Sequence, residues 1–477
     1  MKKESYESPL CSRYASKEMQ YIFSPDMRYH TWRRLWIALA KAQHKLGLAQ
    51  VTEEHIRELE AGIEDIDYEA IAAKEKETRH DVMAHVYGYG LNCPNAKGII
   101  HLGATSCYVT DNADAVIYRD ALVLVRKKLL TVIANLAAFA DKYKSLPTLG
   151  YTHYQPAQLV TVGKRASLWL QDFVLDVEEM DFVISTVRML GSKGTTGTQA
   201  SFLSLFDGDH EKVRKLDKLI ADEFDMAECY HVSGQTYPRK ADSRILNVLS
   251  AIAQSAYKFA DDMRLLQHMR EVEEPFEKGQ IGSSAMAYKR NPMRCERICS
   301  LSRYIMADAQ NSAMTASTQW LERTLDDSAN RRIALPEGFL ACDAVLNLLI
   351  NVTENLVVYP KVIEKNLSEF LPFIATENLL MAAVKRGGDR QVMHEIIRRH
   401  SMDAAAAMKL EGKPCDLLSR LAADPDFLLD ESQLKDALKA EDYIGRAPEQ
   451  VTEYIEEVVK PLLESHDYEH MTASVNV

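Results

Sequence analysis

The middle third of the chain carries apolar residues at alternating steps of three and four over many turns. This spacing places them along one face of a helix, and its persistence is typical of long helices packed side by side. The pattern predicts an all-α protein with a long-helix bundle at its centre. Three runs show it: Tyr118, Leu122, Val125, Leu129, Val132, Leu136, Phe139 and Tyr143; Val162, Ala166, Trp169, Phe173, Val177, Met180, Ile184 and Val187; and Ile245, Leu249, Ile252, Ala256, Phe259, Met263 and Leu266.

The apolar faces of these helices are wider than a single packing stripe. Ile117, Leu130, Ile133, Leu246 and Leu265 are also apolar and lie outside the three runs. A helix that is apolar over more than half of its circumference has to be covered by several neighbours. We therefore expect a bundle that other subunits complete.

Composition agrees with few, long elements and excludes several classes of protein. The 477 residues include 20 Gly and 15 Pro, whereas average usage would give about 33 and 24. The net charge of −12 argues against a nucleic-acid partner, which needs a concentrated basic face. The sequence shows no signal peptide and no apolar run of about 18 residues or more. We expect a cytoplasmic protein without a membrane segment.

Neither a metal nor a nucleotide cofactor is indicated by the motifs. The eight cysteines are scattered without a Cys-x-x-Cys pair, so we expect reduced thiols. His80 and His85 are five residues apart, not the four of a zinc-binding helix. The Gly-rich stretch 191–197 lacks the spacing of a phosphate-binding loop, and the chain has no dinucleotide fingerprint.

Breaks in the helical pattern divide the chain into three parts. A Gly-rich, Pro-containing segment at 88–98 places the first boundary just beyond it. After residue 360 the helical stretches become shorter and are broken by Pro, Asp and Gly. We predict three helical domains: 1–110, 111–360 and 361–477.

The segment 279–297 is a polar interruption between two helices that need to be buried. Two glycines and the pair Asn291-Pro292 break the helical pattern there, and the segment carries Ser283 and Lys289. A solvated connection would explain the polarity equally well. A polar loop held between two buried helices is also a common place for a ligand site.

Two further segments carry groups suited to chemistry. His153, flanked by Thr152 and Gln155 ahead of a helix, could act as an acid or base near neutral pH. Thr105 and Ser106 lie just ahead of a long helix, where hydroxyls and backbone N–H groups can bind a carboxylate. Simple helix capping is the alternative explanation for these two hydroxyls.

The string Gly282-Ser-Ser-Ala-Met-Ala-Tyr-Lys289-Arg-Asn291-Pro292 closely resembles the signature loop of the fumarase/aspartase superfamily. The string Thr152-His-Tyr-Gln-Pro-Ala-Gln158 resembles a second segment of that superfamily. Three more strings narrow the resemblance to the adenylosuccinate lyases of the animal type. They are Ser12-Arg-Tyr-Ala-Ser16, Glu77-Thr-Arg-His-Asp-Val-Met-Ala-His85 and Leu325-Asp-Asp-Ser-Ala-Asn-Arg-Arg332. This resemblance covers the chain from about residue 8 to about residue 465.

The resemblance implies a fold, an activity and an assembly. Members of this family eliminate fumarate from adenylosuccinate, giving AMP, and from the succinylated aminoimidazole carboxamide ribotide (SAICAR), giving AICAR, in purine nucleotide biosynthesis. They use general acid and base catalysis, without a metal or other cofactor. In the superfamily the long helices of four chains form one central bundle, and each active site draws on three chains.

The resemblance also implies residue roles. By position, Ser283 matches the base, His153 the general acid, and His80 a partner in the same site. Lys289 and Asn291 are expected on the succinyl carboxylates, and arginines on the phosphate, which they can bind bidentately. The substrate-binding set is Arg13, Tyr14, Arg79, Asp81, Thr105, Ser106, Gln235, Lys289, Asn291, Arg297, Ser328 and Arg332.

One departure and two rival readings accompany the resemblance. Ala287 stands where the family usually has proline, which predicts a more flexible loop. Another lyase of the superfamily, such as an argininosuccinate lyase, is the nearest rival, and the extra arginines argue against it. A non-catalytic bundle of the lens-crystallin kind, or a helical scaffold, would not need the polar groups of segment 279–297.

Overall fold

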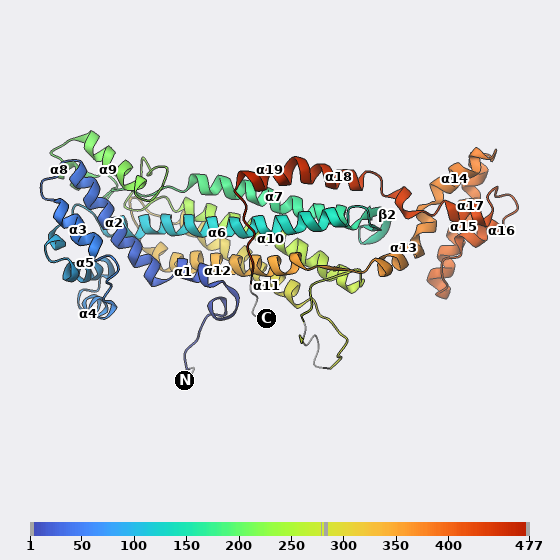
Figure 1. Ribbon diagram of the computed structural model, residues 1–477, viewed down its shortest axis with the longest axis horizontal. Coiled ribbons are helices and arrows are strands. Elements are labelled where there is room, and N and C mark those ends of the chain that lie inside the picture. The colour runs from blue at the N-terminus through green and yellow to red at the C-terminus, as the bar shows by residue number, and fades with distance from the viewer. Residues whose placement is uncertain (1–3, 278, 281–284, 474–477) are drawn as a thin grey trace.

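In the computed structural model of this protein, residues 4–277, 279–280 and 285–473 are described. Long helices run along the long axis of an elongated molecule, with α2–α5 gathered at one end and α14–α17 at the other (Figure 1). The predicted all-α class is confirmed, and strand is confined to two short two-stranded sheets in the described part of the chain.

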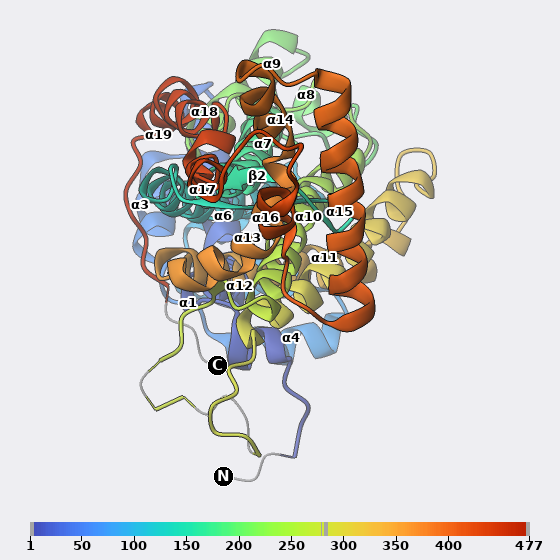
Figure 2. The same ribbon diagram turned by 90° about the vertical axis from the view of Figure 1, so that its right-hand side faces the viewer.

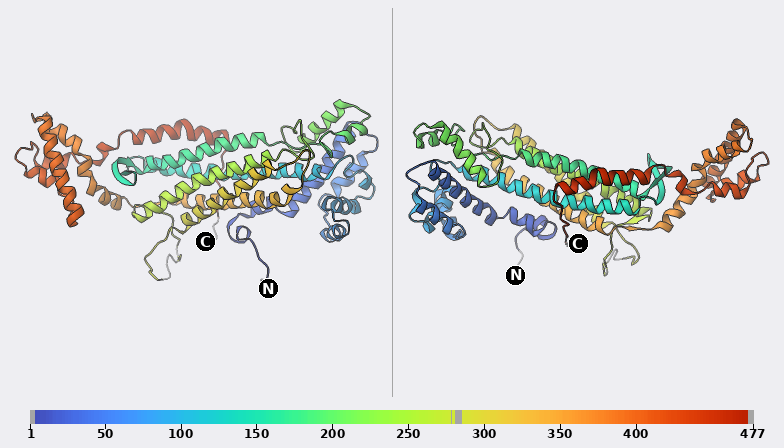
Figure 3. Two further views of the ribbon diagram at one scale, coloured as in Figure 1. Left: turned by 180° about the vertical axis from the view of Figure 1, so that it is seen from behind. Right: turned by 45° about the horizontal axis from the view of Figure 1, so that its top comes forward.

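Five helices form the central bundle: α6 (Ser106–Lys142), α7 (Val162–Thr186), α10 (Lys240–His268), α11 (Met293–Ser317) and α12 (Asp326–Glu354). They lie side by side along the molecule, as the view from behind in Figure 3 shows. The three apolar runs of the sequence fall on α6, α7 and α10 and supply much of the buried core. With 37 residues, α6 is about 55 Å long at the usual helical rise.

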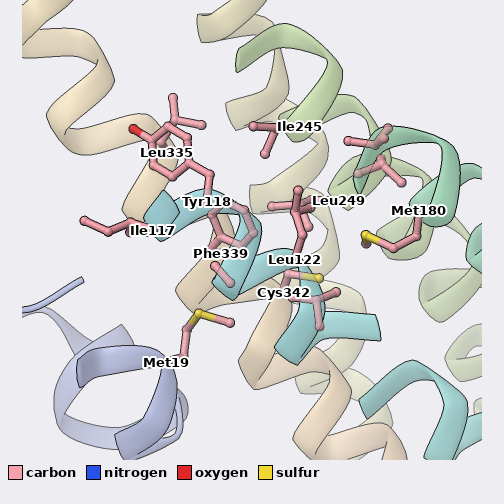
Figure 4. Packing of buried hydrophobic residues seen from close by; sticks show 14 of the residues in the cluster. Met19, Ile117, Tyr118, Leu122, Met180, Ile245, Leu249, Leu335, Phe339 and Cys342 are labelled. Atoms are coloured by element: carbon pink, nitrogen blue, oxygen red, sulfur yellow. The ribbon is translucent and has the colours of Figure 1, made fainter. Parts of the chain in front are cut away.

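The core of the bundle is packed from residues far apart in the sequence. Side chains of α1 (Lys17–Ile22), α6, α7, α10 and α12 meet in one cluster, with Tyr118, Leu249 and Phe339 near its middle (Figure 4). Trp169 of α7 meets Phe259 of α10 edge to face, with ring centroids 5.2 Å apart. The Trp169 indole N–H also donates to Asp262 at 2.7 Å. These contacts lock α7 onto α10.

The spacing of Trp32, Trp36 and Leu39 predicts a helix over 29–47, and the first end of the molecule is built on this helix. It begins earlier than its apolar stripe, because Ser24 caps the helix by accepting from the Met27 N–H at 3.2 Å. Trp32 and Trp36 on this helix are buried. The elements are η1 (Leu10–Tyr14), α2 (Pro25–Lys45), α3 (Glu53–Ala61), α4 (Tyr68–Thr78), α5 (Asp81–Asn92) and η2 (Ala96–Gly98).

The polar composition of segment 147–158 predicts a loop, but the segment is part of an antiparallel hairpin of β1 (Pro147–Thr152) and β2 (Gln155–Thr161). Thr152 pairs with Gln155, so His153 and Tyr154 form a two-residue turn, with φ of 52° and 58°. Positive φ at both positions suits the twist of a tight hairpin. Because neither residue is Gly, Asn or Asp, the usual turn signal was missing from the sequence.

Shorter elements complete the chain between the long helices. The Gly-rich stretch 191–197 is followed by α8 (Ala200–Leu205) and α9 (His210–Asp222). β3 (Val272–Glu273) pairs with β4 (Val357–Val358) and joins the ends of α10 and α12.

The last part of the chain has a small core of its own. α13 (Pro360–Ile374) leads to α14 (Thr376–Lys385), α15 (Arg390–Glu411), α16 (Leu417–Ala423), α17 (Glu431–Asp436) and η3 (Ala440–Tyr443). Apolar residues from Ala375 to Leu434 form a separate cluster there, and α14–α17 face the viewer in the end-on view of Figure 2.

The final helices return to the bundle. α18 (Ala447–Tyr454), η4 (Ile455–Val459) and α19 (Lys460–Ser465) run back along α7 (Figure 1), and Val451, Ile455 and Val459 belong to the main core. The domain boundaries at 110 and 360 stay predictions. We propose that the third unit ends near 445, since the helices after it share the core of the bundle.

One helix of the described chain, α12, is long and apolar enough to cross a membrane, and the bent pair α13–α14 passes the same test only when taken together. Glu337 and Asp343 interrupt the apolar sequence of α12, so this helix is not an uninterrupted apolar run of the kind the sequence was searched for. In α12, 83% of the relevant window is buried inside the protein. The central helix of a bundle has this composition because neighbouring helices cover it on all sides.

Gly163 lets the start of α7 approach the end of α6. A Cβ at this position would lie 2.2 Å from the Ala140 carbonyl oxygen and 2.6 Å from the Lys144 backbone. Backbone atoms cannot move aside as the end of a flexible side chain can. The turn from the hairpin into α7 therefore depends on the missing side chain.

We expect Gly163→Ala to destabilise the protein by about 1–3 kcal/mol, the usual cost of overpacking a tight contact. Gly98→Ala is the matched control, because a Cβ there would meet nothing within 4 Å. Thermal unfolding followed by circular dichroism measures both. Equal midpoints for the two variants would contradict the proposed close approach.

Candidate active site

A cavity of about 300 Å³ opens at the first end of the bundle, where α2, α5, α6 and α12 meet. Its walls come from segments that are far apart in the sequence. Six of the residues expected to serve the site line it: His80, Asp81, Ser106, Gln235, Ser328 and Arg332.

His80 is held in one orientation by the start of α5. It is the N-cap residue, and its Nδ1 accepts from the Met83 backbone N–H at 3.3 Å. Its Nε2 lies 3.3 Å from Ser106 Oγ at the start of α6. Since Nδ1 accepts, the proton of the neutral ring sits on Nε2 and points at Ser106. The ring can thus pass a proton to, or polarise, a group near Ser106.

An ion pair joins two of the expected segments across the cavity. Arg332 of α12 lies 3.4 Å from Asp81 of α5 and remains largely exposed. Arg79, by contrast, ends α4 in the left-handed conformation with φ of 56° and does not line the cavity. Thr105 precedes α6, but within the described residues its side chain makes no capping hydrogen bond. The Thr105 hydroxyl therefore does not cap α6.

Two hydrogen bonds fix the orientation of the Gln235 side-chain amide. Its Nε2 donates to the Thr195 carbonyl at 3.1 Å, and its Oε1 accepts from the Cys107 thiol at 3.6 Å. Burial raises the pKa of Cys107 to about 12, so this thiol keeps its proton. A carbonyl can only accept, which fixes which end of the Gln235 amide faces Thr195.

The floor of the cavity is a buried network of ion pairs that sequence analysis missed. Arg239 donates to Asp111 at 2.9 Å and to Asp327 at 2.6 Å. Arg323 also donates to Asp327, at 2.9 Å. Burial raises the pKa of Asp327, but the charges of its arginine partners outweigh that effect, so the pKa is lowered overall.

A second buried arginine extends this network. Arg331 donates to Asp242 at 2.6 Å, to Asp114 at 3.0 Å and to the Tyr237 hydroxyl at 2.5 Å. The sequence carried one signal of this network, since aspartates stand on the otherwise apolar faces of long helices. A buried charge is usually paired with an opposite charge. The partners of these aspartates could not be assigned from one sequence. The network fixes the start of α12, which carries Ser328 and Arg332.

The remaining expected residues lie elsewhere in the chain. His153 is exposed at the tip of the β1–β2 hairpin, and β2 lies at the opposite end of the bundle from α5 (Figure 1). The hairpin packs there through Leu149 and Leu159 against α13. Within one chain, His153 cannot reach His80.

A third group lies around the start of α11. Arg297 on α11 stacks its guanidinium over the Tyr14 ring at 5.4 Å, and Arg13 beside it is exposed. Lys289 is exposed and Asn291 is half-buried just before the helix. Arg297 Nη1 is buried without an acceptor among the described residues, a condition that favours an added partner. Ser283 lies outside the described residues.

In the described part of the chain, no three His, Cys, Asp or Glu side chains gather in a way that could hold a metal ion.

One wall of the cavity rests on an aromatic group. Trp32, which lines the cavity, meets the buried His85 ring edge-on at 5.2 Å. Tyr29 stacks on the His85 ring at 3.8 Å and also meets the Trp32 ring edge-on at 5.1 Å. Burial lowers the pKa of His85 to about 4, because a charged ring would lose its hydration there. The group therefore packs around a neutral imidazole.

Comparison with known proteins gives consistent results over most of the chain. Residues 14–307 match the family model described as lyase, and residues 372–454 match the one described as adenylosuccinate lyase C-terminus. The chain is 52% identical to the adenylosuccinate lyase of Schizosaccharomyces pombe, covering 96% of each chain. It is 51% identical to that of Saccharomyces cerevisiae, covering 97% of this chain and 96% of the relative.

Solved structures support the fold. A 3-carboxy-cis,cis-muconate lactonizing enzyme from Pseudomonas putida superposes with a TM-score of 0.79 at 23% identity, covering 94% of this chain and 98% of that one. A fumarate lyase from Mesorhizobium superposes with a TM-score of 0.78 at 23% identity, covering 95% and 99%. At this identity the likeness bears on the fold alone.

We expect His85 to make stability fall as the pH drops from 6.5 towards 4. Its pKa is about 4 in the folded chain, against an ordinary value of 6.5, so the unfolded chain takes up the proton first. The contribution is complete above pH 6.5 and decreases by up to about 3 kcal/mol towards pH 4. Chemical denaturation across this range should show a shallower decline for His85→Phe. The exposed His231 provides a control: if His231→Phe alters the slope as much, the assignment to His85 is wrong.

Proposed function

This chain belongs to the adenylosuccinate lyase family, and from that membership we propose that it cleaves adenylosuccinate to AMP and fumarate. The observation that carries the proposal is the 52% identity to a relative of that name over 96% of both chains. We propose the parallel cleavage of SAICAR to AICAR and fumarate as its second activity, and the cytoplasm as its location.

The reaction is a β-elimination that needs a base, an acid and donors for negative charge. The base takes a proton from the carbon beside one succinyl carboxylate, the C–N bond breaks, and the acid protonates the departing nitrogen. The negative charge of the intermediate accumulates on that carboxylate. Preorganised hydrogen-bond donors around it are therefore expected to supply much of the rate enhancement.

We assign Ser283 as the base and His153 as the general acid. Serine is a weak base at its free pKa, and the positive charge of Lys289 would favour its ionised form. His80 is assigned to the same site as a partner whose Nε2 proton points at Ser106. Lys289 and Asn291 are assigned to the succinyl carboxylates.

The cavity at the first end supplies the cations that a phosphate needs. Arg332 is largely exposed there, and Arg323 also lines it. Each is held on one side by a carboxylate, Asp81 or Asp327, and a guanidinium so fixed keeps N–H groups for a phosphate oxygen. Ser328 and Gln235 lie in the same cavity as further donors.

We propose that the complete site forms between copies of the chain in a homotetramer. His80 touches Ser106 at one end of α6, while His153 lies on the hairpin beyond its other end. With 37 residues in α6, these groups are separated by about 55 Å of helix. Only another copy of the chain can bring His153 to a cavity that contains His80.

An apolar stripe on α7 supports this assembly. Leu168, Leu175 and Phe182 follow one another at intervals of seven residues and are 47%, 54% and 53% exposed in the single chain. Seven-residue spacing is the geometry of helices that pack along one another. A second copy of the bundle would cover this stripe.

We expect the purified protein to release fumarate from adenylosuccinate, and Ser283→Ala to lose at least about 10³-fold in turnover, as removal of an activated catalytic group does. The variant should still bind substrate, because the cavity cations are untouched. Absorbance at the purine band measures turnover, and calorimetry measures binding. Near-normal turnover by Ser283→Ala would place the base elsewhere, whereas a folded wild type without turnover would refute the proposed activity.

Mixing two inactive variants tests the shared site. His153→Ala and His80→Ala should each be nearly inactive alone. Hybrids formed by refolding them together should regain about a quarter of wild-type activity, because random assembly places both intact residues in that fraction of sites. Mixing His153→Ala with a second His153 variant, His153→Gln, is the control and should regain nothing. If the first mixture stays inactive while hybrids form, His153 and His80 are not drawn from different chains.

A further inference from the structure

The two ends of the segment between β3 and α11 are tied to each other by buried polar contacts. The first end is 273–277 and the second is 290–295. In each tie, a side chain from one end, or from α10, reaches the other end. Gln267 of α10 and the residues of the two ends that make these contacts form what we call the loop clamp.

Glu274 makes the central tie. It is 4% exposed, and its two carboxylate oxygens accept from the backbone N–H groups of Arg294 at 3.0 Å and Cys295 at 2.9 Å. The residue before α11 is Pro292, which offers no side-chain cap. First-turn N–H groups have no partner inside a helix, and the helix dipole favours an anion there. Glu274 thus caps a helix on the far side of the loop.

Arg294, at the second end, binds two residues of the first end. Its side chain is fully buried and donates to the Pro275 carbonyl oxygen and, at 2.5 Å, to the Glu277 carboxylate. A guanidinium holds two partners in a fixed plane, so it sets their relative position as well as their distance. The first end is therefore fixed by a residue of the second.

Gln267 attaches both ends to the rigid α10. Its Oε1 accepts from the Glu274 N–H at 3.3 Å, and its Nε2 donates to the Arg290 carbonyl oxygen at 3.0 Å. Arg290 in turn lies 3.5 Å from Glu273 and stacks over the Phe276 ring at 5.0 Å. Every one of these ties crosses between the two ends or between an end and the bundle.

We propose that Glu274 and Arg294, anchored through Gln267, are positioning residues that set the places of Lys289 and Asn291 for the elimination. This inference rests on the proposed function. Lys289 and Asn291 flank Arg290, whose carbonyl oxygen is held by Gln267. A shift of the second end therefore moves both side chains relative to the bundle. Catalytic groups need placement within about 0.5 Å.

The clamp acts on one half of the substrate only. Lys289 and Asn291 are the groups assigned to the succinyl carboxylates, which leave as fumarate. Two cations proposed for the phosphate, Arg323 and Arg332, belong to the cavity lined by α5, α6 and α12. Arg297, which is also expected to bind the substrate, lies on α11, and the packing of that helix along α10 keeps it in place when the loop ends loosen. Loosening the clamp should therefore weaken fumarate binding and leave AMP binding intact, a difference that general destabilisation would not produce.

The test is Glu274→Gln, which keeps the size of the side chain but offers an N–H₂ group to one of the two helix N–H groups. We expect kcat to fall about 10- to 100-fold, as small misplacements of catalytic groups do. Inhibition by fumarate should weaken by a similar factor, with inhibition by AMP unchanged. Steady-state kinetics with each product as inhibitor measures all three.

Glu58→Gln is the matched control. Glu58 also accepts from two backbone N–H groups at a helix start, those of Asn95 and Ala96 at 3.1 and 2.7 Å, but it is not part of the loop clamp. It should leave kcat and both inhibition constants at wild-type values. Because wild-type turnover is measured first, a failure of the proposed activity is seen separately from a failure of the clamp.

Glu277→Gln serves if Glu274→Gln does not fold, because Glu277 is 63% exposed and its loss leaves the core intact. It should lower kcat by a smaller factor and again weaken fumarate inhibition selectively. The proposal is overturned if the folded variants match Glu58→Gln. It is also overturned if fumarate and AMP inhibition weaken together.

Discussion

The length of α6 decides how an active site can be built on this chain. Its 37 residues separate the His80–Ser106 contact at one end from the β1–β2 hairpin beyond the other. The packing of α6 against α7 and α12 makes that separation rigid. Local rearrangement cannot join the two groups, so a site that needs both has to be assembled from more than one copy.

Buried charge sets the orientation of the side chains around the cavity. The Arg239–Asp327 and Arg331–Asp242 pairs hold the start of α12 at the cavity floor. Breaking one partner of such a buried pair is expensive, since it leaves an uncompensated charge. The Glu274 carboxylate on the first turn of α11 applies the same device to the loop ends. The side chains that we propose to bind the substrate are thus held in place by polar contacts between other residues.

The sequence could predict those features of the fold and the site that depend on local periodicity or on a short motif. The apolar runs located α6, α7 and α10 because burial imposes the helical period on the sequence. The hairpin at His153–Tyr154 was missed because its turn lacks the residues that normally favour positive φ. The Asp111–Arg239 pair was missed because its members are 128 residues apart. Such pairs are decided by tertiary packing alone, as is the distance between His80 and His153.

The measurement that tests the account most directly is specific activity as a function of oligomeric state. Adenylosuccinate cleavage should be assayed over a dilution series while light scattering reports the molar mass in the same samples. The account predicts that activity per chain falls in step with the loss of the tetramer and vanishes in the monomer. A folded monomer with full activity would contradict it, because all groups of the site would then have to come together within one chain.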